Sequence, residues 1–148
     1  MTLLHLYRSF ERMKTNMRQF SVHTQEHTQF VNITTEIQHA VNDADVKHGV
    51  CHVFIPHTTA GITINENADP DVVRDLIATL ERLVPWRGDY RHDEGNSAAH
   101  LKASLMGSTQ TVIIQDGRLA LGTWQSIYFC EFDGPRDRKA WIEIIPAG

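Results

Sequence analysis

The spacing of apolar residues along the chain predicts two principal helices and one shorter helix. Residues 33–44 place their apolar side chains on one helical stripe. The strongest pattern starts at Asp69, which suits an N-cap, and Pro70, which suits the first helical position. The apolar face expected to be buried in this second helix comprises Val72, Val73, Leu76, Ile77, Leu80, Leu83 and Val84. A shorter helix is expected over residues 96–106.

Shorter runs rich in β-branched and aromatic residues predict strands around these helices. The expected strands cover residues 19–25, 50–56, 61–65, 109–115, 118–125, 126–132 and 139–146. Asp116 and Gly117 together are a strong signal for a tight hairpin turn, and no internal repeat or low-complexity linker interrupts the pattern. The sequence therefore predicts a single compact α+β domain with a largely antiparallel β-sheet system.

Composition narrows the choice of partners and compartment. With 14 Lys+Arg against 18 Asp+Glu, the formal net charge of the 148-residue chain is -4, which provides no general attraction to nucleic acid or to an anionic membrane. No stretch reaches the roughly 20 apolar residues that a membrane-spanning helix needs. Cys51 and Cys130 lie in apolar runs without C-x-x-C spacing, which favours buried, reduced thiols. These observations predict a cytoplasmic protein with neither a nucleic-acid nor a membrane partner.

The start of the chain differs from the rest. Residues 1–16 combine helically spaced apolar residues with basic ones, yet they lack the continuous apolar core of a signal peptide. Met17 is itself a possible alternative start. We therefore expect residues 1–16 to be an N-terminal extension outside the working fold, and residues 17–148 to form the domain.

The segment from His57 to Asp71 carries more polar chemistry than a strand needs for structural reasons. It places a histidine, hydroxyls, amides and carboxylates around a short apolar run. The hydroxyls of Thr58 and Thr59 directly follow the histidine and are candidate ligand-binding groups. The segment is therefore the first candidate for a functional site.

Three polar residues at the end of this segment precede the second principal helix. Glu66 is either a surface carboxylate or an acid, a base or a metal ligand, and Asn67 beside it is grouped with it as a candidate catalytic residue. Asn65 is a candidate ligand-binding residue, although asparagines at such positions also serve turns. The sequence leaves these alternatives open.

Three histidines stand at or beside element boundaries, where side chains from distant segments converge. His57 follows a strand, His92 lies in a polar loop, and His100 lies in the first turns of the shorter helix. Three neutral imidazoles with an open coordination position suit zinc or a similar divalent ion. Their spacing matches no compact local ligand motif, so solvated or core histidines are the alternative.

A basic group is a further candidate site. Arg136 and Arg138 follow a turn, and together with Lys102 they are candidates for an anion site, because guanidinium groups match phosphate oxygens in a bidentate fork. Solvated surface charges are the alternative interpretation. The chain lacks a Gly-rich phosphate loop, a G-x-S-x-G elbow and an H-E-x-x-H motif.

Several of these blocks, taken in order, resemble the YjbQ family, whose members are labelled secondary thiamine-phosphate synthases. The blocks are H-T-T-A-G-I-T-I-N-E-N from His57, the Asp69–Pro70 helix start, H-D-E-G-N from His92, H-L-K from His100, G-R-L-A-L-G-T-W-Q from Gly117 and E-F-D-G-P-R from Glu131. The resemblance extends from about Arg18 to Ile145.

The resemblance implies a compact α+β domain that assembles as a homotrimer. It also implies a pocket lined by the histidine-bearing blocks, where a divalent metal ion such as zinc or magnesium and small phosphorylated ligands bind. The implied activity joins a hydroxymethylpyrimidine pyrophosphate to a thiazole phosphate with loss of pyrophosphate, in a reaction assisted by the metal. Two other functions remain open: a trimer that binds metal and phosphorylated ligands without significant catalysis, and a metal-dependent hydrolase that uses Glu66 as its base.

Overall fold

Two antiparallel sheets form the body of the protein in a computed structural model that describes residues 17–148. The large sheet has the strand order β1-β8-β3-β5-β6, and the small sheet has the order β2-β7-β4. The strands are β1 (Arg18–His23), β2 (Gln29–Asn32), β3 (Gly49–Phe54), β4 (Ala60–Glu66), β5 (Thr109–Gln115), β6 (Arg118–Leu119), β7 (Gln125–Glu131) and β8 (Asp137–Pro146). The helices are α2 (Thr34–Ala44), α3 (Pro70–Leu83) and α4 (Ser97–Met106). Every paired strand is antiparallel, which confirms the α+β prediction.

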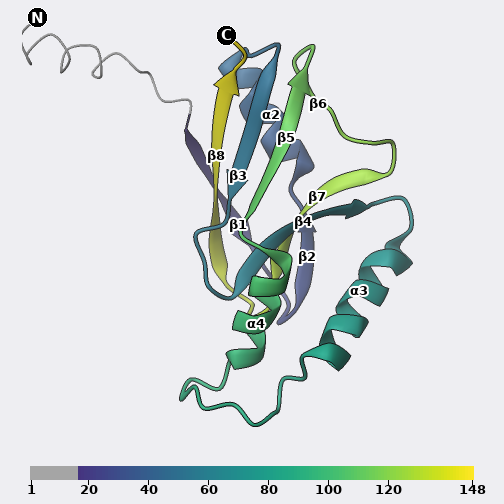
Figure 1. Cartoon of the computed structure of the whole chain (residues 1–148), viewed down its shortest axis with the longest axis vertical. Helices are drawn as coiled ribbons and strands as arrows, with labels where there is room; N and C mark the ends of the chain where they lie inside the picture. Colours follow the sequence, from purple (N-terminus) through teal and green to yellow (C-terminus); the bar gives the residue numbers. More distant parts are fainter. Residues whose placement is uncertain (1–16) are drawn as a thin grey trace, which may run out of the picture.

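The layers follow from which faces of the sheets are apolar. Inward residues of the large sheet, such as Val53 and Ile142, pack with Ile37 of α2 and with Phe129 of the small sheet in one buried cluster. The opposite face of the small sheet is covered by α4, which lies against β4 (Figure 1). The small sheet is thus buried on both faces, and β7 is buried along almost its whole length for that reason.

Polar side chains before α3 and α2 bind backbone N–H groups in the first turns of these helices. The Asp69 side chain accepts a hydrogen bond from the Asp71 N–H at 2.9 Å, so the predicted N-cap of α3 is confirmed. The N-cap of α2 is Ile33, which has no side-chain cap bond, and the Asn32 side-chain oxygen just before it accepts from the Thr34 N–H at 3.1 Å. Helix α2 ends at Ala44, next to Asp45 in the left-handed conformation.

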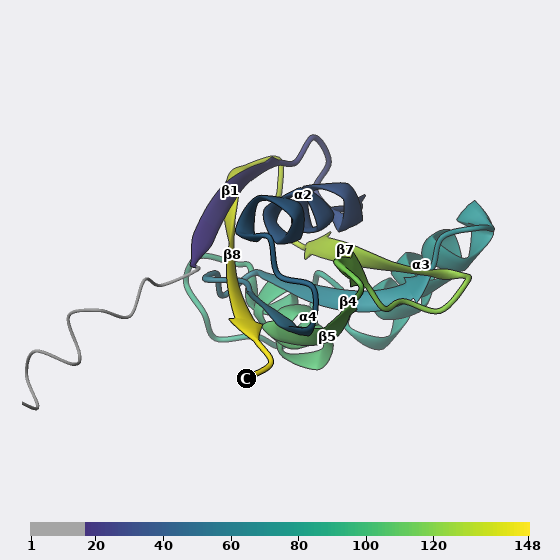
Figure 2. The same ribbon diagram turned by 90° about the horizontal axis from the view of Figure 1, so that it is seen from above.

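Helix α3 buries only part of the face predicted for it. Only Leu80 is buried, and Leu83 remains 70% exposed. Figures 1 and 2 both place α3 at the edge of the molecule, beside the sheets and α4 and not on top of them. The amphipathic pattern correctly predicted the helix, but most of its apolar stripe is only half-buried. Leu80 and Val73 pack against the buried cluster that includes Phe132.

The predicted strand over residues 118–125 is wrong in its second half. Strand β6 ends at Leu119, and a turn follows before β7 begins at Gln125. The Gln125 side-chain oxygen accepts from the Gly122 N–H at 2.8 Å, and the Gln125 N–H donates to the Gly122 carbonyl at 3.0 Å. These reciprocal bonds form a turn over residues 122–125 in place of the predicted strand.

The predicted boundary between an N-terminal extension and the domain stays a prediction. The described residues, 17–148, carry both sheets and all the helices named above. The N-terminal extension predicted for residues 1–16 lies outside the described residues. No helix within residues 17–148 is both long enough and apolar enough to cross a membrane.

Candidate functional site

Three connections meet at one end of the two sheets and enclose a pocket. They are the loop between β3 and β4, the loop that leads into α4, and the turn between β7 and β8. The pocket has a volume of about 580 Å³. Its lining includes His57, Thr58, Thr59, Glu94, Asn96, His100, Ser108, Asp133, Arg136 and Arg138. The pocket therefore contains most of the predicted ligand-binding residues.

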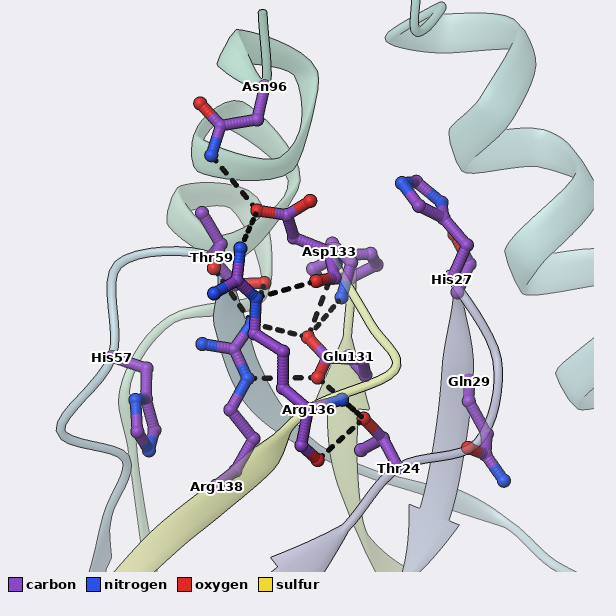
Figure 3. A network of polar contacts seen from close by, with 12 residues as sticks. Thr24, His27, Gln29, His57, Thr59, Asn96, Glu131, Asp133, Arg136 and Arg138 are labelled. Carbon is purple, nitrogen blue, oxygen red and sulfur yellow. Dashed lines mark hydrogen bonds and ion pairs between the residues drawn. The ribbon is translucent and has the colours of Figure 1, made fainter. Parts of the chain in front are cut away.

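A buried ion pair forms the floor of the pocket. Glu131 is fully buried, and Arg138, 6% exposed, approaches it side-on through two of its nitrogens, with Nε 2.9 Å from Oε1 (Figure 3). The Arg138 Nη2 also donates to the Thr59 hydroxyl at 2.8 Å. Thr24 donates a further hydrogen bond to Glu131 at 2.8 Å. Burial raises the pKa of Glu131, but the hydrogen bonds and positive charge of Arg138 outweigh burial and hold it below its ordinary value.

A second arginine is held by the turn between β7 and β8. The Arg136 Nε donates to the Asp133 carbonyl at 2.8 Å, and its Nη2 donates to the Asp133 carboxylate at 3.1 Å. Asn96 donates to the same carboxylate at 2.9 Å from the start of α4 (Figure 3). The Asn96 side-chain oxygen is buried and accepts no hydrogen bond from the described residues. Asp133 therefore fixes both a guanidinium and an amide at the pocket wall.

Both guanidinium groups keep unused donors. A guanidinium has five N–H donors, and side-on pairing with a carboxylate occupies only the Nε and Nη2 edge. Within residues 17–148, the Nη1 atoms of Arg136 and Arg138 make no hydrogen bond. Figure 3 shows no dashed contact at this nitrogen of Arg138, whose side chain lies near His57. The carboxylates thus orient two cations that can still bind an anion.

His57 enters the pocket with a defined tautomer. Its Nε2 accepts a hydrogen bond from the Lys139 N–H at 2.8 Å, which requires a lone pair on that nitrogen. The ring proton of neutral His57 is therefore on Nδ1. Burial lowers the pKa of His57, and the positive charge of Arg138 lowers it further. His57 is consequently a neutral donor near neutral pH.

The three histidines of the predicted metal site do not surround one point. His57 and His100 line the pocket described above, whereas His92 lines an adjacent pocket to which His100 also contributes. The rings of His92 and His100 lie 5.3 Å apart at an angle of 82°. Among residues 17–148 no group of three or more His, Cys, Asp or Glu side chains is arranged to hold a metal ion. The described residues of one chain therefore do not fit the implied metal.

Lys102 does not belong to the predicted anion site. Its side chain is fully buried, and its Nζ donates to Glu81 of α3 at 2.5 Å. Because α4 lies against the small sheet, a side chain on this side of the helix turns toward α3 and away from the pocket. The structure therefore corrects this prediction: Lys102 ties two helices together.

The predicted catalytic pair also lies elsewhere. Strand β4 leaves the pocket at Ala60 and ends at Glu66, and seven residues of extended chain span about 20 Å. Asn65 accepts the Glu66 N–H with its own side chain at 2.7 Å, and the Asn67 N–H donates to the Trp124 carbonyl at 2.9 Å. Neither Glu66 nor Asn67 lines the pocket, so a hydrolase with Glu66 as base in this pocket is not supported.

Three residues that hold the arginines or their partners in place were not predicted as functional. Glu131 offered a signal, because a carboxylate in the apolar run I-Y-F-C-E-F requires a buried partner. Asp133 and Asn96 offered none, since turns and helix starts use these residue types routinely. Their roles depend on the contact between the β7–β8 turn and α4, which only the fold reveals.

The fold and the site together define a class of small α+β domains: two antiparallel sheets with a polar, arginine-bearing pocket at one end. The model of the family described as UPF0047 protein YjbQ-like matches residues 18–147, and the chain belongs to this family.

Individual relatives agree with the family assignment. The chain is 50% identical to a UPF0047 protein of Methanocaldococcus jannaschii, over 85% of this chain and 91% of the relative. It is 45% identical to the UPF0047 protein YugU of Bacillus subtilis, over 87% and 98% of the two chains. A crystal structure of a YjbQ/UPF0047 family protein of Clostridium acetobutylicum is 58% identical, with a TM-score of 0.85 over 86% of this chain and 99% of that one.

Proposed function

We propose that the pocket binds a small pyrophosphorylated molecule and supports a secondary thiamine-phosphate synthase-like reaction. The observation that carries the proposal is the pair of arginines, Arg136 and Arg138, each oriented by a carboxylate and each with an unused Nη1 edge at one pocket. Two such edges match the several oxygens of a pyrophosphate. The hydroxyls of Thr58 and Thr59 and the ring N–H of His57 add neutral donors.

The proposed reaction needs no nucleophile from the protein. The carbon–oxygen bond between a pyrimidine methylene and pyrophosphate breaks, and its electron pair leaves with the pyrophosphate. The nitrogen of a thiazole phosphate supplies the pair for the new carbon–nitrogen bond, so no redox partner is needed. The residues of the pocket serve to stabilise the growing negative charge of the leaving group, which arginines held in place do without reorganising.

The experiment compares two arginines with similar local pairing. Arg136 pairs with Asp133 three residues before it, and Arg74 pairs with Asp71 three residues before it on exposed α3. We expect Arg136→Ala to weaken binding of inorganic pyrophosphate about tenfold or more in calorimetry, because a charge-assisted bond is lost. Arg74→Ala should leave this affinity unchanged. Equal affinities in both variants would contradict the proposal, and steady-state assays with the two thiamine precursors test the reaction itself.

Binding without significant catalysis is the second candidate function. The observation that favours it is that Glu131 and Asp133 already pair with the two guanidinium groups and offset their charge. A cation that is neutralised in the ground state gains less from a developing anion. Pyrophosphate binding that depends on Arg136, together with turnover numbers far below about 1 per second, would favour this candidate.

Homotrimeric assembly is part of the proposal, and the outer face of the large sheet supports it. At one end Phe54 pairs in register with Trp141, and these side chains are 37% and 38% exposed. At the other end Val50 pairs with both Ile113 and Ile145, which are 63% and 51% exposed. An apolar sheet face of this kind favours burial against further copies of the chain.

A cytoplasmic location completes the proposal. Cys51 and Cys130 are both free and buried. Burial raises the pKa of Cys51 to about 12 and also raises that of Cys130, which leaves both thiols unreactive. Two inert thiols are compatible with a reducing compartment. Fractionation of cells that express the full chain would test this location.

A further inference from the structure

A second pocket adjoins the site, and His100 belongs to the walls of both. The second pocket has a volume of about 520 Å³ and is lined by Asp89, Tyr90, Arg91, His92, Ser97, His100 and Leu101. Its residues come from the loop after α3 and from the first turns of α4. Two pockets that share a single side chain provide adjacent places for two molecules.

The walls of the second pocket suit a flat ring. The Tyr90 hydroxyl donates to the Pro85 carbonyl at 2.7 Å, which holds the phenol ring in place. Leu101 projects from α4 and is 47% exposed. A fixed aromatic side chain beside an exposed aliphatic one offers contact surface to an aromatic or heteroaromatic ligand.

Arg91 gives the second pocket a cation that differs from those of the first. Arg136 and Arg138 are paired with carboxylates, whereas Arg91 makes no ion pair or hydrogen bond with any residue from 17 to 148. Asp89 lines the same pocket and also has no ion-pair partner in this part of the chain. The guanidinium of Arg91 therefore keeps all its donors for an anionic group such as a phosphate.

We infer that the second pocket holds the second reactant, a phosphorylated heteroaromatic molecule, with its ring against Tyr90 and Leu101 and its phosphate at Arg91. The inference rests on the proposed function, since a condensation requires both reactants to be bound side by side. The nucleophilic ring nitrogen and the pyrophosphate occupy opposite sides of the reacting carbon as one bond forms and the other breaks. His100 lies where the two pockets meet and therefore borders this carbon.

The test uses calorimetry to measure the affinities of two ligands, pyrophosphate and the thiazole phosphate, for the same set of variants. We expect Arg91→Ala to weaken binding of the thiazole phosphate about tenfold while pyrophosphate affinity stays within about twofold, because only one phosphate contact is lost. Arg136→Ala should show the reverse. Arg87→Ala is the matched control, because Arg87 is exposed in the same loop but lines neither pocket. Tyr90→Phe and Leu101→Ala check the ring contacts.

A second experiment tests whether the two ligands bind at the same time. If the two subsites are distinct, saturating pyrophosphate leaves the thiazole phosphate able to bind. Mutual exclusion of the two ligands, or thiazole phosphate binding that is insensitive to Arg91→Ala, would overturn the second subsite and leave the pyrophosphate pocket standing. A different result would overturn the proposed function and keep the subsite. In that result, Arg136→Ala does not weaken pyrophosphate binding, while thiazole phosphate still binds and still depends on Arg91.

Discussion

Glu131 and Arg138 form a side-on ion pair in which the carboxylate is fully buried and the guanidinium is 6% exposed. The pair joins the end of β7 to the start of β8, and it also fixes Thr59 in the neighbouring loop. Taking two charges out of water is unfavourable unless their hydrogen bonds are satisfied. Here Thr24, Thr59 and two backbone N–H groups complete the network, so the same contacts shape both the fold and the pocket floor.

The pair predicts a specific dependence of stability on pH. The pKa of Glu131 is lower in the folded state than its ordinary value of 4.5, so its contribution is fully present above that value. The contribution is lost as pH falls through the lower, folded pKa. We expect the wild-type melting temperature to fall across this acidic range more steeply than that of Glu131→Gln. Thermal unfolding monitored by circular dichroism at a series of pH values makes the comparison.

Asp137→Asn provides the control for this prediction. Asp137 also pairs with a base, His23, but both side chains are highly exposed. Exposed pairs contribute little to stability. The Asp137→Asn protein should therefore follow the wild-type acid profile, and a Glu131→Gln profile that also coincides with wild type would contradict the prediction.

A second prediction concerns the ion pair of Lys102 and Glu81. Replacing one partner should reduce the free energy of unfolding more than replacing the other. The Lys102 side chain is fully buried, whereas that of Glu81 is 41% exposed. Glu81→Gln leaves a buried ammonium without its counter-charge and should destabilise the fold by about 3–5 kcal/mol. Lys102→Met leaves only a carboxylate that water reaches, so its cost should be clearly smaller. Chemical denaturation of both single variants and the double variant measures the difference, and a larger cost for Lys102→Met would refute this account.

The sequence predicted the positions of the helices and turns more accurately than it predicted which of their surfaces are buried. The capping of α3 by Asp69 and the turn at Asp116 and Gly117 are local, so the residues themselves determine them. The burial of the α3 face is not local, because it depends on where the chain places the helix. An apolar stripe predicts that a helix forms but does not identify the surface against which it packs.

The same limit applied to the site. The expectation that the segment from His57 to Asp71 forms one site treated neighbours in sequence as neighbours in space, yet the length of β4 separates His57 from Glu66. Conversely, Asn96 and Asp133 are distant in sequence and meet through one hydrogen bond. The direction of β4 decides the first outcome and the contact between the β7–β8 turn and α4 decides the second, and residue types alone reveal neither.

The divalent ion stays a prediction, and it can be tested on each histidine separately. If His57, His92 and His100 bind one ion, the purified protein should hold a metal that is lost on acidification, because ligation requires neutral imidazole. Each single substitution by alanine should then lower the metal content measured by mass spectrometry. His52→Ala is the control, since this histidine lies on the outer face of the large sheet and bonds to Thr111. Equal metal content in wild type and all three variants would remove the hypothesis.

The final prediction concerns the trimer and the face that forms it. Strand β7 is apolar, but it is buried inside one chain and offers no surface for assembly. The face available for assembly is instead the outer side of the large sheet, where Ile113 and Ile145 are exposed. We expect sedimentation to give about three times the 16.9 kDa chain mass. Ile113→Asp should shift the protein toward the monomer, because a carboxylate buried at an interface lacks a partner.

Leu105→Asp tests whether this effect belongs to the sheet face or to any exposed apolar side chain. Leu105 is 61% exposed, close to the 63% of Ile113, but it lies on α4. The same substitution there removes a comparable apolar side chain and introduces the same charge, so it should leave the sedimentation coefficient unchanged if only the sheet face is covered. A wild-type chain that sediments as a monomer at micromolar concentration would refute the assembly. A trimer that survives Ile113→Asp but not Leu105→Asp would assign its contacts to α4 instead of the large sheet.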